Sequence, residues 1–565
     1  MHELVVRGGT VIDGTGADRR VADVAIDGGV ITEVGEVAER GEQEIDAAGM
    51  LVTPGFVDIH THYDGQVSWD PLLTPSSWHG VTTVVMGNCG VGFAPVRPDR
   101  HDWLISLMEG VEDIPGSALA EGIDWTWESF PQYLDSIEAS PHAIDIGTQV
   151  PHGALRAYVM GERAAADVEA TPEEVAEMAR LTREAVQAGA LGFTTSRTRA
   201  HKSADGSYIP TLGAPADELL AIAAAMGTTG EGVFEIVSDF IDFEAEFGLM
   251  RAMAETTGRP LSITFAQNDR NPHLWKKLLE CVEEAVAEGI PMRLQVSGRP
   301  IGLLMGFQTS MHPFLGHPAY KAIASLPLPE RMVRLRDPEL RAQLVADRTD
   351  GRPAGTAGEF HKMFPLGEPP DYEPAPETSI AAIAAREGRR PAEVAYDRML
   401  QSDGHEMLYF PLLNYSQMDL EPTRELLEHP LTVLGLSDGG AHCGVICDAS
   451  LPTSMLTHWG RDRTRGEKLG LEWLVRAQTK DTALAVGLQD RGVLAPGMRA
   501  DLNVIDFDAL TLGRPEMVFD LPAGGRRLVQ KAEGYVATVV AGEVTFRDGE
   551  HTGALPGRLI RGAQS

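Results

Sequence analysis

The sequence predicts an α/β fold: a closed (β/α)8 barrel of the triosephosphate isomerase type, carrying a small β-sandwich built from both chain termini. Apolar strand-like runs alternate with amphipathic helix-like runs through the middle of the chain, which is typical of a parallel α/β architecture. Eight strand-like runs occur, at residues 52–60, 81–87, 143–150, 190–196, 232–237, 261–265, 291–296 and 431–438. Polar residues of metal-binding type follow the first and eighth runs, at the strand ends where barrels of this type carry their chemistry.

The two ends of the chain share a texture of short alternating strands separated by turn glycines. Candidate strands there are residues 4–6, 24–26, 31–34, 501–505, 535–540 and 543–546. Gly8-Gly9 and Asp27-Gly28-Gly29 punctuate the first group, as hairpins require. Neither end has enough apolar surface to fold alone. We therefore expect residues 1–52 and 491–565 to pair in one β-sandwich, with the barrel, residues 53–490, inserted between them.

Helices are expected between several of the barrel strands, and residues 172–188 are the clearest example. Thr171 is a suitable N-cap, Pro172 takes the first helical position and Glu174 completes a capping box. The start of this helix is therefore predicted from local chemistry.

About 130 residues separate the seventh strand from the eighth, and we interpret residues 297–430 as an insertion over the barrel mouth, part of it a lid. Pro, Gly and charged residues dominate positions 350–377, and helical patterns resume at 380–385 and 391–399. A plain linker is the alternative. It is disfavoured because the segment contains more large apolar residues than a linker needs, namely Met305, Phe307, Met311 and Phe314.

The bulk composition limits the classes of partner. The 48 Lys and Arg residues against 82 Asp and Glu residues give a formal net charge of −34, which disfavours nucleic acid and anionic membrane surfaces. No run of eighteen or more apolar residues occurs, and the N-terminus lacks the pattern of a signal segment. We expect a cytoplasmic protein. The net charge says little about a small-molecule substrate, because a local pocket can differ from the mean field. The four cysteines, Cys89, Cys281, Cys443 and Cys447, are too few for a disulfide framework and are expected to be reduced thiols.

The strongest chemical signal is the pair His60-x-His62 at the end of the first strand. Residues two apart on a strand point to the same side, so both imidazoles can reach one divalent metal. Asp438 follows the eighth strand and supplies a carboxylate. Two imidazoles and a carboxylate leave an open metal position, as a hydrolytic site needs. The alternative, that the histidine pair arose by chance, is weakened by the barrel context.

The fold plan and the stretch Pro54-Gly-Phe-Val-Asp-Ile-His-Thr-His62 resemble the amidohydrolase superfamily, and other motifs resemble its D-aminoacylase (N-acyl-D-amino-acid deacylase) branch. These motifs are Gly87-Asn-Cys-Gly90 followed by Ala94-Pro95, His152-Gly-Ala-Leu-Arg156, Gly189-Ala-Leu-Gly192, Ser437-Asp-Gly439 and Gly492-Val-Leu-Ala-Pro-Gly497. The similarity extends over nearly the whole chain.

The resemblance implies that a divalent metal, usually zinc and here one ion, activates a water molecule to attack an amide carbonyl. It implies that His60 and His62 are metal ligands and that Asp438 is the general base, with a further contact to the metal. Cys89 takes the position of the family's cysteine ligand. A small buried residue in a tight turn is the alternative for Cys89.

The chain departs from the family at strands five and six, where relatives carry histidines and residues 233–239 and 261–269 carry none. Either the metal sits among His60, His62 and Asp438, or other residues substitute. Glu235 is the favoured substitute, whereas Gln267, Asp239 and Asp269 are expected to be ordinary polar residues. Strand four lacks a lysine, so the carboxylated-lysine binuclear site of hydantoinases and dihydroorotases is not expected.

Residues beyond the metal ligands are predicted to act on the substrate. His442 lies four residues after Asp438, so a loop could fold it over the metal to stabilise an oxyanion or to add a ligand. A loop histidine bonded only to backbone is the alternative. An N-acyl amino acid has a free carboxylate, and a bidentate arginine is its natural clamp. Arg156, Arg197, Arg199, Arg293 and Arg299 lie in or just after barrel strands, and we predict Arg197 and Arg293, with His152, to bind substrate.

Taken together, the sequence predicts a metal-dependent hydrolase of a C–N amide bond, with an N-acyl-D-amino acid or related small amide as substrate. The alternatives are hydrolysis of another small amide, a cyclic imide or an ester, or a barrel that binds a small molecule after its metal site has decayed. By analogy with similar barrels, a homo-oligomer is also expected.

Overall fold

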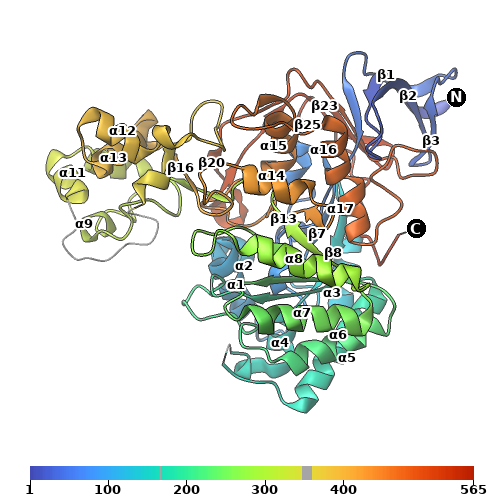
Figure 1. Ribbon diagram of the computed structural model, residues 1–565, viewed down its shortest axis with the longest axis horizontal. Helices are drawn as coiled ribbons and strands as arrows, with labels where there is room; N and C mark the ends of the chain where they lie inside the picture. The colour runs from blue at the N-terminus through green and yellow to red at the C-terminus, as the bar shows by residue number, and fades with distance from the viewer. Residues whose placement is uncertain (166, 347–358, 565) are drawn as a thin grey trace.

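The computed structural model describes residues 1–165, 167–346 and 359–564, and its centre is a parallel barrel (Figure 1). Two parallel sheets make the barrel wall, one in the order β6-β7-β8 and one in the order β17-β13-β12-β11-β10-β9. The strands are β6 (Phe56–Asp58), β7 (Val81–Met86), β8 (Asp145–Thr148), β9 (Val150–Pro151), β10 (Gly192–Arg197), β11 (Val233–Ser238), β12 (Leu261–Phe265), β13 (Met292–Val296) and β17 (Thr432–Leu434). Each lies within or overlaps a predicted run, so the predicted strand order is confirmed.

The barrel closes at two places where the sheets meet. Only Gln149 separates β8 from β9, so one continuous segment joins the two sheets. On the other side, the peptide after β6 pairs with the peptide after β17: the backbone N–H of Asp438 donates to the His60 carbonyl at 3.1 Å, and that of His62 donates to the Gly439 carbonyl at 2.7 Å. Closure therefore brings the ends of the first and last strands into direct contact.

Helices cover the outside of the barrel (Figure 1). They are α1 (His101–Glu112), α3 (Phe130–Ala139), α4 (His152–Met160), α5 (Pro172–Ala188), α6 (Ala216–Gly227), α7 (Phe243–Thr257) and α8 (Leu274–Ala287), with α16 (Leu471–Gln478) and α17 (Lys480–Ala485) after the last strand. Helix α5 begins as predicted. The Thr171 hydroxyl accepts from the Glu174 N–H at 3.3 Å, and the Glu174 carboxylate accepts from the Thr171 N–H at 2.8 Å.

Both chain termini contribute strands to one nine-stranded sheet in the order β25-β24-β23-β18-β5-β1-β2-β3, with β4 paired to β1. Its members are β1 (His2–Val11), β2 (Arg20–Asp27), β3 (Val30–Gly35), β4 (Gly41–Asp46), β5 (Leu51–Pro54), β18 (Leu502–Ile505), β23 (Tyr535–Val540), β24 (Glu543–Arg547) and β25 (Glu550–His551). Strands β5 and β18 run antiparallel and join the N-terminal strands to the C-terminal ones. The two-layered sandwich and the segment bounds 1–52, 53–490 and 491–565 stay predictions.

A buried ion network ties the barrel to the segment that enters the terminal sheet. Arg491 Nη1 lies 2.7 Å from Asp145 Oδ2 on β8 and donates to Thr83 Oγ1 at 2.9 Å. Arg499 Nη2 lies 2.8 Å from the other Asp145 oxygen. Because the Arg491 and Asp145 side chains are at most 1% exposed, each charge depends on its partner.

Replacing Arg491 by Ala is expected to destabilise the protein by about 3–5 kcal/mol, because it removes the buried cation of the two that face the buried Asp145 carboxylate. Arg180→Ala is the control, since Arg180 makes exposed ion pairs worth about 0–1 kcal/mol. Urea unfolding followed by circular dichroism measures both changes. Equal midpoints for Arg491→Ala and Arg180→Ala would contradict the structural role of the network.

The segment between β13 and β17 folds as a separate lobe, which projects to one side of the barrel (Figure 1). It contains a three-stranded antiparallel sheet of β14 (Gly302–Met305), β15 (Phe364–Pro365) and β16 (Leu408–Pro411), with helices that include α10 (Leu328–Leu335), α12 (Ile380–Glu387) and α13 (Pro391–Met399). Its own apolar core contains Met305, Phe307 and Phe314, while Met311 is 36% exposed. The plain-linker alternative is therefore wrong. Residues 350–358 of the predicted Pro- and Gly-rich stretch lie outside the described residues, and closure of a lid stays a prediction.

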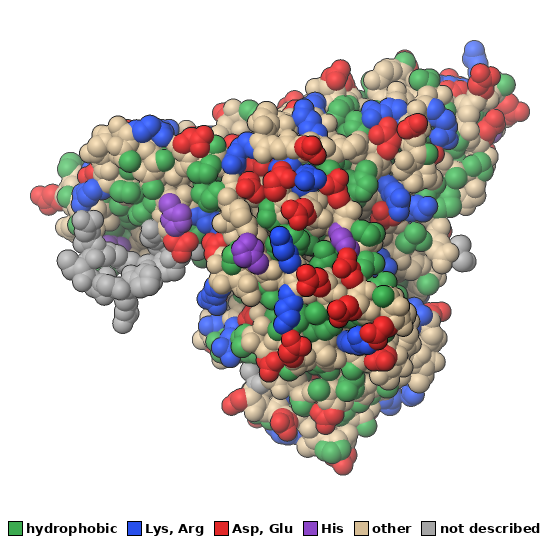
Figure 2. All heavy atoms as spheres, in the orientation of Figure 1, with side chains coloured by type: hydrophobic (Ala, Val, Ile, Leu, Met, Phe, Trp, Pro, Cys, Tyr) green, Lys and Arg blue, Asp and Glu red, His purple; other side chains and the backbone are tan. Residues whose placement is uncertain are grey.

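The surface agrees with the charge balance of the sequence. On the face drawn in Figure 2, acidic and basic side chains are interspersed over the barrel helices, and the described residues form no continuous basic area there. In the described ranges, none of the helices combines the length and the apolar character needed to cross a membrane.

Candidate metal centre

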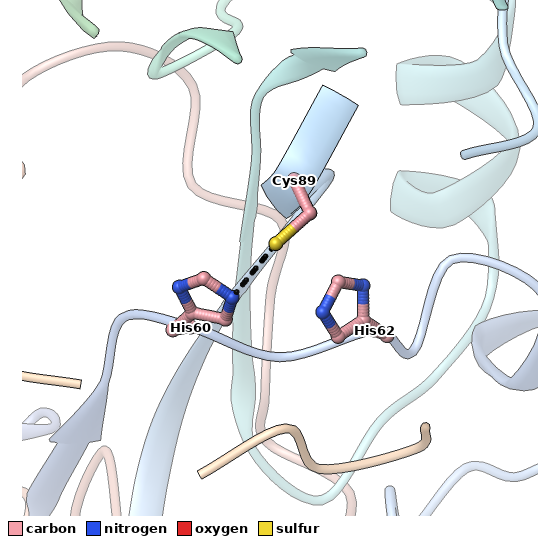
Figure 3. A group of neighbouring side chains, drawn as sticks. All are labelled: His60, His62 and Cys89. Carbon is pink, nitrogen blue, oxygen red and sulfur yellow. Dashed lines mark hydrogen bonds between the residues drawn. The ribbon is translucent and has the colours of Figure 1, made fainter. Parts of the chain in front are cut away.

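His60 and His62 lie in the extended segment that continues from β6. This segment is held on both sides: the Thr61 N–H and hydroxyl donate to the Val85 carbonyl of β7 at 3.1 and 2.9 Å, and the His62 N–H donates to the Gly439 carbonyl. The two rings stand edge to face with centroids 5.4 Å apart. Figure 3 shows both imidazoles on the same side of the segment, facing Cys89. The predicted geometry of the pair is therefore present.

Cys89 reaches the histidines from the tight turn that follows β7. Its φ of 54° is left-handed, and it lies between Gly87 and Gly90, whose φ values are 82° and 68°. A Cβ on Gly87 would lie 2.2 Å from the Gln149 carbonyl oxygen, so the turn requires glycine there. The Cys89 sulfur lies 3.4 Å from His60 Nε2 (Figure 3).

These three side chains fit a divalent metal of borderline softness such as zinc. One donor atom from each of His60, His62 and Cys89 lies within 4.8 Å of the others, and all three residues are buried. Burial lowers the pKa of His60 to about 4 and that of His62 well below its ordinary value, so both rings are neutral, as ligands must be. Burial and the nearby Glu235 and Glu112 carboxylates raise the pKa of the Cys89 thiol, an effect that a bound cation opposes.

Polar residues on the inner faces of β11, β12 and β13 surround the ligands. His60 Nδ1 lies 2.6 Å from the Gln295 amide oxygen. The Glu235 carboxylate accepts from the Cys89 backbone N–H at 2.8 Å, and the Thr264 hydroxyl donates to Glu235 and to Gln295. Burial raises the pKa of Glu235 to about 7. The Glu235 carboxylate therefore bonds to the backbone of the turn that carries Cys89, and its role as a substitute metal ligand stays a prediction.

The other candidate substitutes are occupied elsewhere. Gln267 donates to the Pro272 carbonyl and to Gln417, Asp239 accepts from Thr198 and from the Arg199 N–H, and Asp269 pairs with Lys362 of the inserted lobe. These contacts agree with the expectation that the three are ordinary polar residues.

Asp438 lies at the same face as the two histidines. Its Oδ1 is 3.5 Å from His60 Nε2 and 3.7 Å from His62 Nε2. Its backbone is left-handed, with φ of 49°, and so is that of His442, with φ of 51°. Burial, followed by the charges of Asp448, Asp58 and Glu235, raises the pKa of Asp438 well above its ordinary value. A bound cation would lower the pKa of Asp438.

His442 lies at the rim of the cluster. Its side chain is 26% exposed, and Nε2 lies 3.7 Å from Glu112 Oε2. Burial lowers its pKa to about 4, which favours the neutral ring. The loop after β17 therefore folds the histidine back toward the cluster, as predicted.

Two residues near the cluster were not predicted from the sequence. Glu112, the last residue of α1, has Oε1 3.5 Å from His62 Nδ1. His201 follows β10, and its Nδ1 lies 2.9 Å from the hydroxyl of Ser196 on that strand. Burial and the charge of the nearby His442 lower its pKa to about 4. The position of His201 shortly after a barrel strand is a signal that could have identified it, whereas the helical pattern around Glu112 offers none.

The structure does not bring the three predicted substrate-binding residues to the cluster. His152 lies between Thr195 and Glu218, at 2.8 Å from each, on the outer side of β10. Arg197 makes a bidentate ion pair with Glu246 of α7. Arg293 precedes Gln295 by two residues on β13, so it lies nearer the amino-terminal end of the barrel, and it lines a cavity with His429 and Trp473. Their substrate contacts find no support in this geometry.

Comparisons with known proteins give the family of the chain. The sequence profile of the amidohydrolase family matches residues 43–546, and the chain belongs to that family. It is 28% identical to N-acyl-D-aspartate deacylase of Alcaligenes xylosoxydans xylosoxydans, over 99% of this chain and 95% of that one. It is 29% identical to an uncharacterized protein of Mycobacterium tuberculosis, over 98% of this chain and 93% of that one. A solved structure of D-aminoacylase, described as having a binuclear metal center, superposes with a TM-score of 0.66 and 25% identity over 99% of this chain and 100% of that one.

The family and these relatives identify the chain as a hydrolase that acts on carbon–nitrogen bonds other than peptide bonds. The resemblance to D-aminoacylases drawn from the motifs is confirmed over nearly the whole chain. The roles of individual residues stay predictions.

Proposed function

We propose that this protein hydrolyses the amide bond of an N-acyl-D-amino acid or a related small amide, with one divalent metal ion, zinc or a similar one. The observation that carries the proposal is the cluster of His60, His62 and Cys89, with Asp438 Oδ1 within 3.7 Å of both imidazoles. The relatives named as deacylases of N-acyl-D-amino acids support the substrate class. A single ion is favoured because β11 and β12 carry no histidine.

The two histidines and Cys89 would hold the metal. When bound, such an ion lowers the pKa of a water molecule toward 7 and polarises a carbonyl group. Asp438 Oδ1 lies 3.5 and 3.7 Å from the Nε2 atoms of the two ligand imidazoles, so it would take the proton of the attacking water and pass it to the leaving nitrogen. A carboxylate in this role typically contributes about 10²–10⁴-fold to the rate.

His442 would stabilise the developing oxyanion. Its ring is partly exposed at the rim of the cluster, and a neutral imidazole can donate one N–H to an oxygen atom of the substrate. His201 is a second imidazole at this rim. Its Nε2 makes no hydrogen bond in the part of the chain that the structure describes, so this nitrogen is available to a substrate.

Elimination favours Arg199 as the clamp for the substrate carboxylate. Arg156 pairs with Glu218, Arg197 with Glu246 and Arg299 with Asp448. Arg293 lies toward the opposite end of the barrel. Arg199 is exposed in the loop that also carries His201, and its guanidinium has no ion-pair partner among the described residues.

A substrate panel tests the proposed function. We expect the zinc-loaded enzyme to hydrolyse N-acetyl-D-amino acids with kcat/KM about tenfold or more above that for the L enantiomers, a difference of about 1.4 kcal/mol. The carboxamide derivatives, which lack the carboxylate, should be poorer substrates than the free acids. Arg199→Ala should reduce this preference for the free acid over its carboxamide. Initial rates of amine release measure each case.

The outcomes of the panel separate the alternatives. Turnover of a cyclic imide or an ester, without turnover of N-acyl-D-amino acids, would retain the reaction class and overturn the substrate. Tight binding of panel compounds without turnover of any would favour a small-molecule-binding barrel.

A further inference from the structure

Glu112 is a buried acid beside the metal cluster that the proposed chemistry does not use. Its side chain is 2% exposed at the end of α1. Its Oε1 lies 3.5 Å from His62 Nδ1, and its Oε2 lies 3.7 Å from His442 Nε2. Neither His62 Nδ1 nor Glu112 Oε2 has a hydrogen-bond partner among the described residues. One carboxylate therefore faces both a predicted metal ligand and the predicted oxyanion-stabilising residue.

The separation between Glu112 and His442 is set by backbone contacts. The His442 N–H donates to the carbonyl of Glu112, and the Gly444 N–H donates to Asp113 Oδ2 at 3.0 Å. Gly444 is needed for this close approach, since a Cβ there would lie 1.9 Å from Ser310 Oγ and 2.6 Å from Asp113 Oδ2. The loop after β17 and the end of α1 are thus fixed to each other, and flexible side chains alone do not determine their contact.

The two nitrogens of His62 face different groups. Nε2 lies on the side of Asp438, at 3.7 Å from its Oδ1, whereas Nδ1 lies on the side of Glu112. A carboxylate that accepts the Nδ1 proton fixes the tautomer whose Nε2 lone pair is free, and makes that nitrogen a stronger donor to a metal. His60 has a comparable partner, because its Nδ1 lies 2.6 Å from the Gln295 amide oxygen. In both ligand rings, therefore, Nε2 lies near Asp438 and an acceptor oxygen lies next to Nδ1.

We propose that Glu112 is a positioning residue of the metal centre: its carboxylate orients His62 through Nδ1 and faces the His442 ring, while its backbone carbonyl holds the loop that carries His442. This inference rests on the proposed metal-dependent function and adds to it the last residue of an outer helix. It assigns to α1 a part in the active site.

Zinc affinity of three variants tests the inference without the need for a substrate. Glu112→Ala should weaken zinc binding by about 10–100-fold, the usual effect of removing a carboxylate behind a ligand histidine. Zinc binding by Glu112→Gln should lie between that of Glu112→Ala and that of the wild type, because an amide oxygen can also accept the Nδ1 proton. Glu109→Gln is the matched control: Glu109 lies one turn earlier on α1, is exposed and accepts from the Gly116 N–H. Competition with a chromogenic chelator gives each affinity.

Unfolding temperatures of the metal-depleted variants identify a merely structural role. If Glu112→Ala does not fold, the isosteric Glu112→Gln decides: weaker zinc binding than in Glu109→Gln supports the inference, and equal binding overturns it. A lower unfolding temperature with unchanged zinc affinity also overturns it. If the wild-type protein itself binds no zinc, the proposed function fails. If the wild type binds zinc and the Glu112 variants bind it equally well, only the inference about Glu112 fails.

Discussion

Asp438→Asn is expected to reduce kcat by at least about 100-fold while the protein keeps its metal. The substitution removes the carboxylate that lies 3.5 and 3.7 Å from the two ligand imidazoles, and general base catalysis of this kind contributes about 10²–10⁴-fold. His60, His62 and Cys89 remain in the variant, so metal binding should persist. Steady-state kinetics on the best substrate of the panel, beside elemental analysis, measures both quantities.

Asp269→Asn is the control for this prediction. Asp269 also follows a barrel strand, but its carboxylate pairs with Lys362 of the inserted lobe and contacts no member of the cluster. This variant should keep most of its kcat. A fully active Asp438→Asn enzyme would remove the proposed base and favour another proton acceptor near the metal.

The double variant His60→Ala, His62→Ala is expected to lose both activity and the stabilisation that added zinc gives. A ligand that binds only the folded state stabilises it by about 2.7 kcal/mol at a concentration 100 times its dissociation constant. Zinc should therefore raise the unfolding temperature of the wild-type protein and leave that of the double variant unchanged. Scanning fluorimetry with and without zinc measures this difference.

His429→Ala is the matched control, because His429 is a histidine of the protein exterior that pairs with Glu283. Its response to zinc should equal that of the wild type. If zinc stabilised the double variant as strongly as the wild type, the metal would bind somewhere other than the predicted cluster.

The barrel could be predicted from the sequence because each of its strands is a short apolar run next to a helical pattern. The histidine pair could be predicted because residues two apart on a strand share a side, and closure of the barrel then brings Asp438 to the same face. Both inferences depend on local periodicity and strand order, which a sequence displays directly.

The substrate-binding residues could not be predicted, because alternation along a strand gives two sides without saying which one faces the barrel interior. That assignment needs one residue of the strand whose contacts inside the barrel are known. Ser196 contacts His201 near the cluster, so its neighbour Arg197 points outward to Glu246. Arg293 points to the same side of β13 as Gln295 but lies nearer the amino-terminal end of the barrel, away from the cluster. Glu112 was missed for a different reason: its position depends on how the loop after β17 packs on α1, a contact between segments more than 300 residues apart.

Metal content per chain is the most direct test of the central claim. Elemental analysis of protein purified without added metal, and again after reconstitution with zinc, gives the number of ions bound. We expect about one zinc or similar divalent ion per chain in the wild type and none in the His60→Ala, His62→Ala variant. Wild-type protein that holds no metal even after reconstitution would contradict the account and leave the barrel as a binder of small molecules.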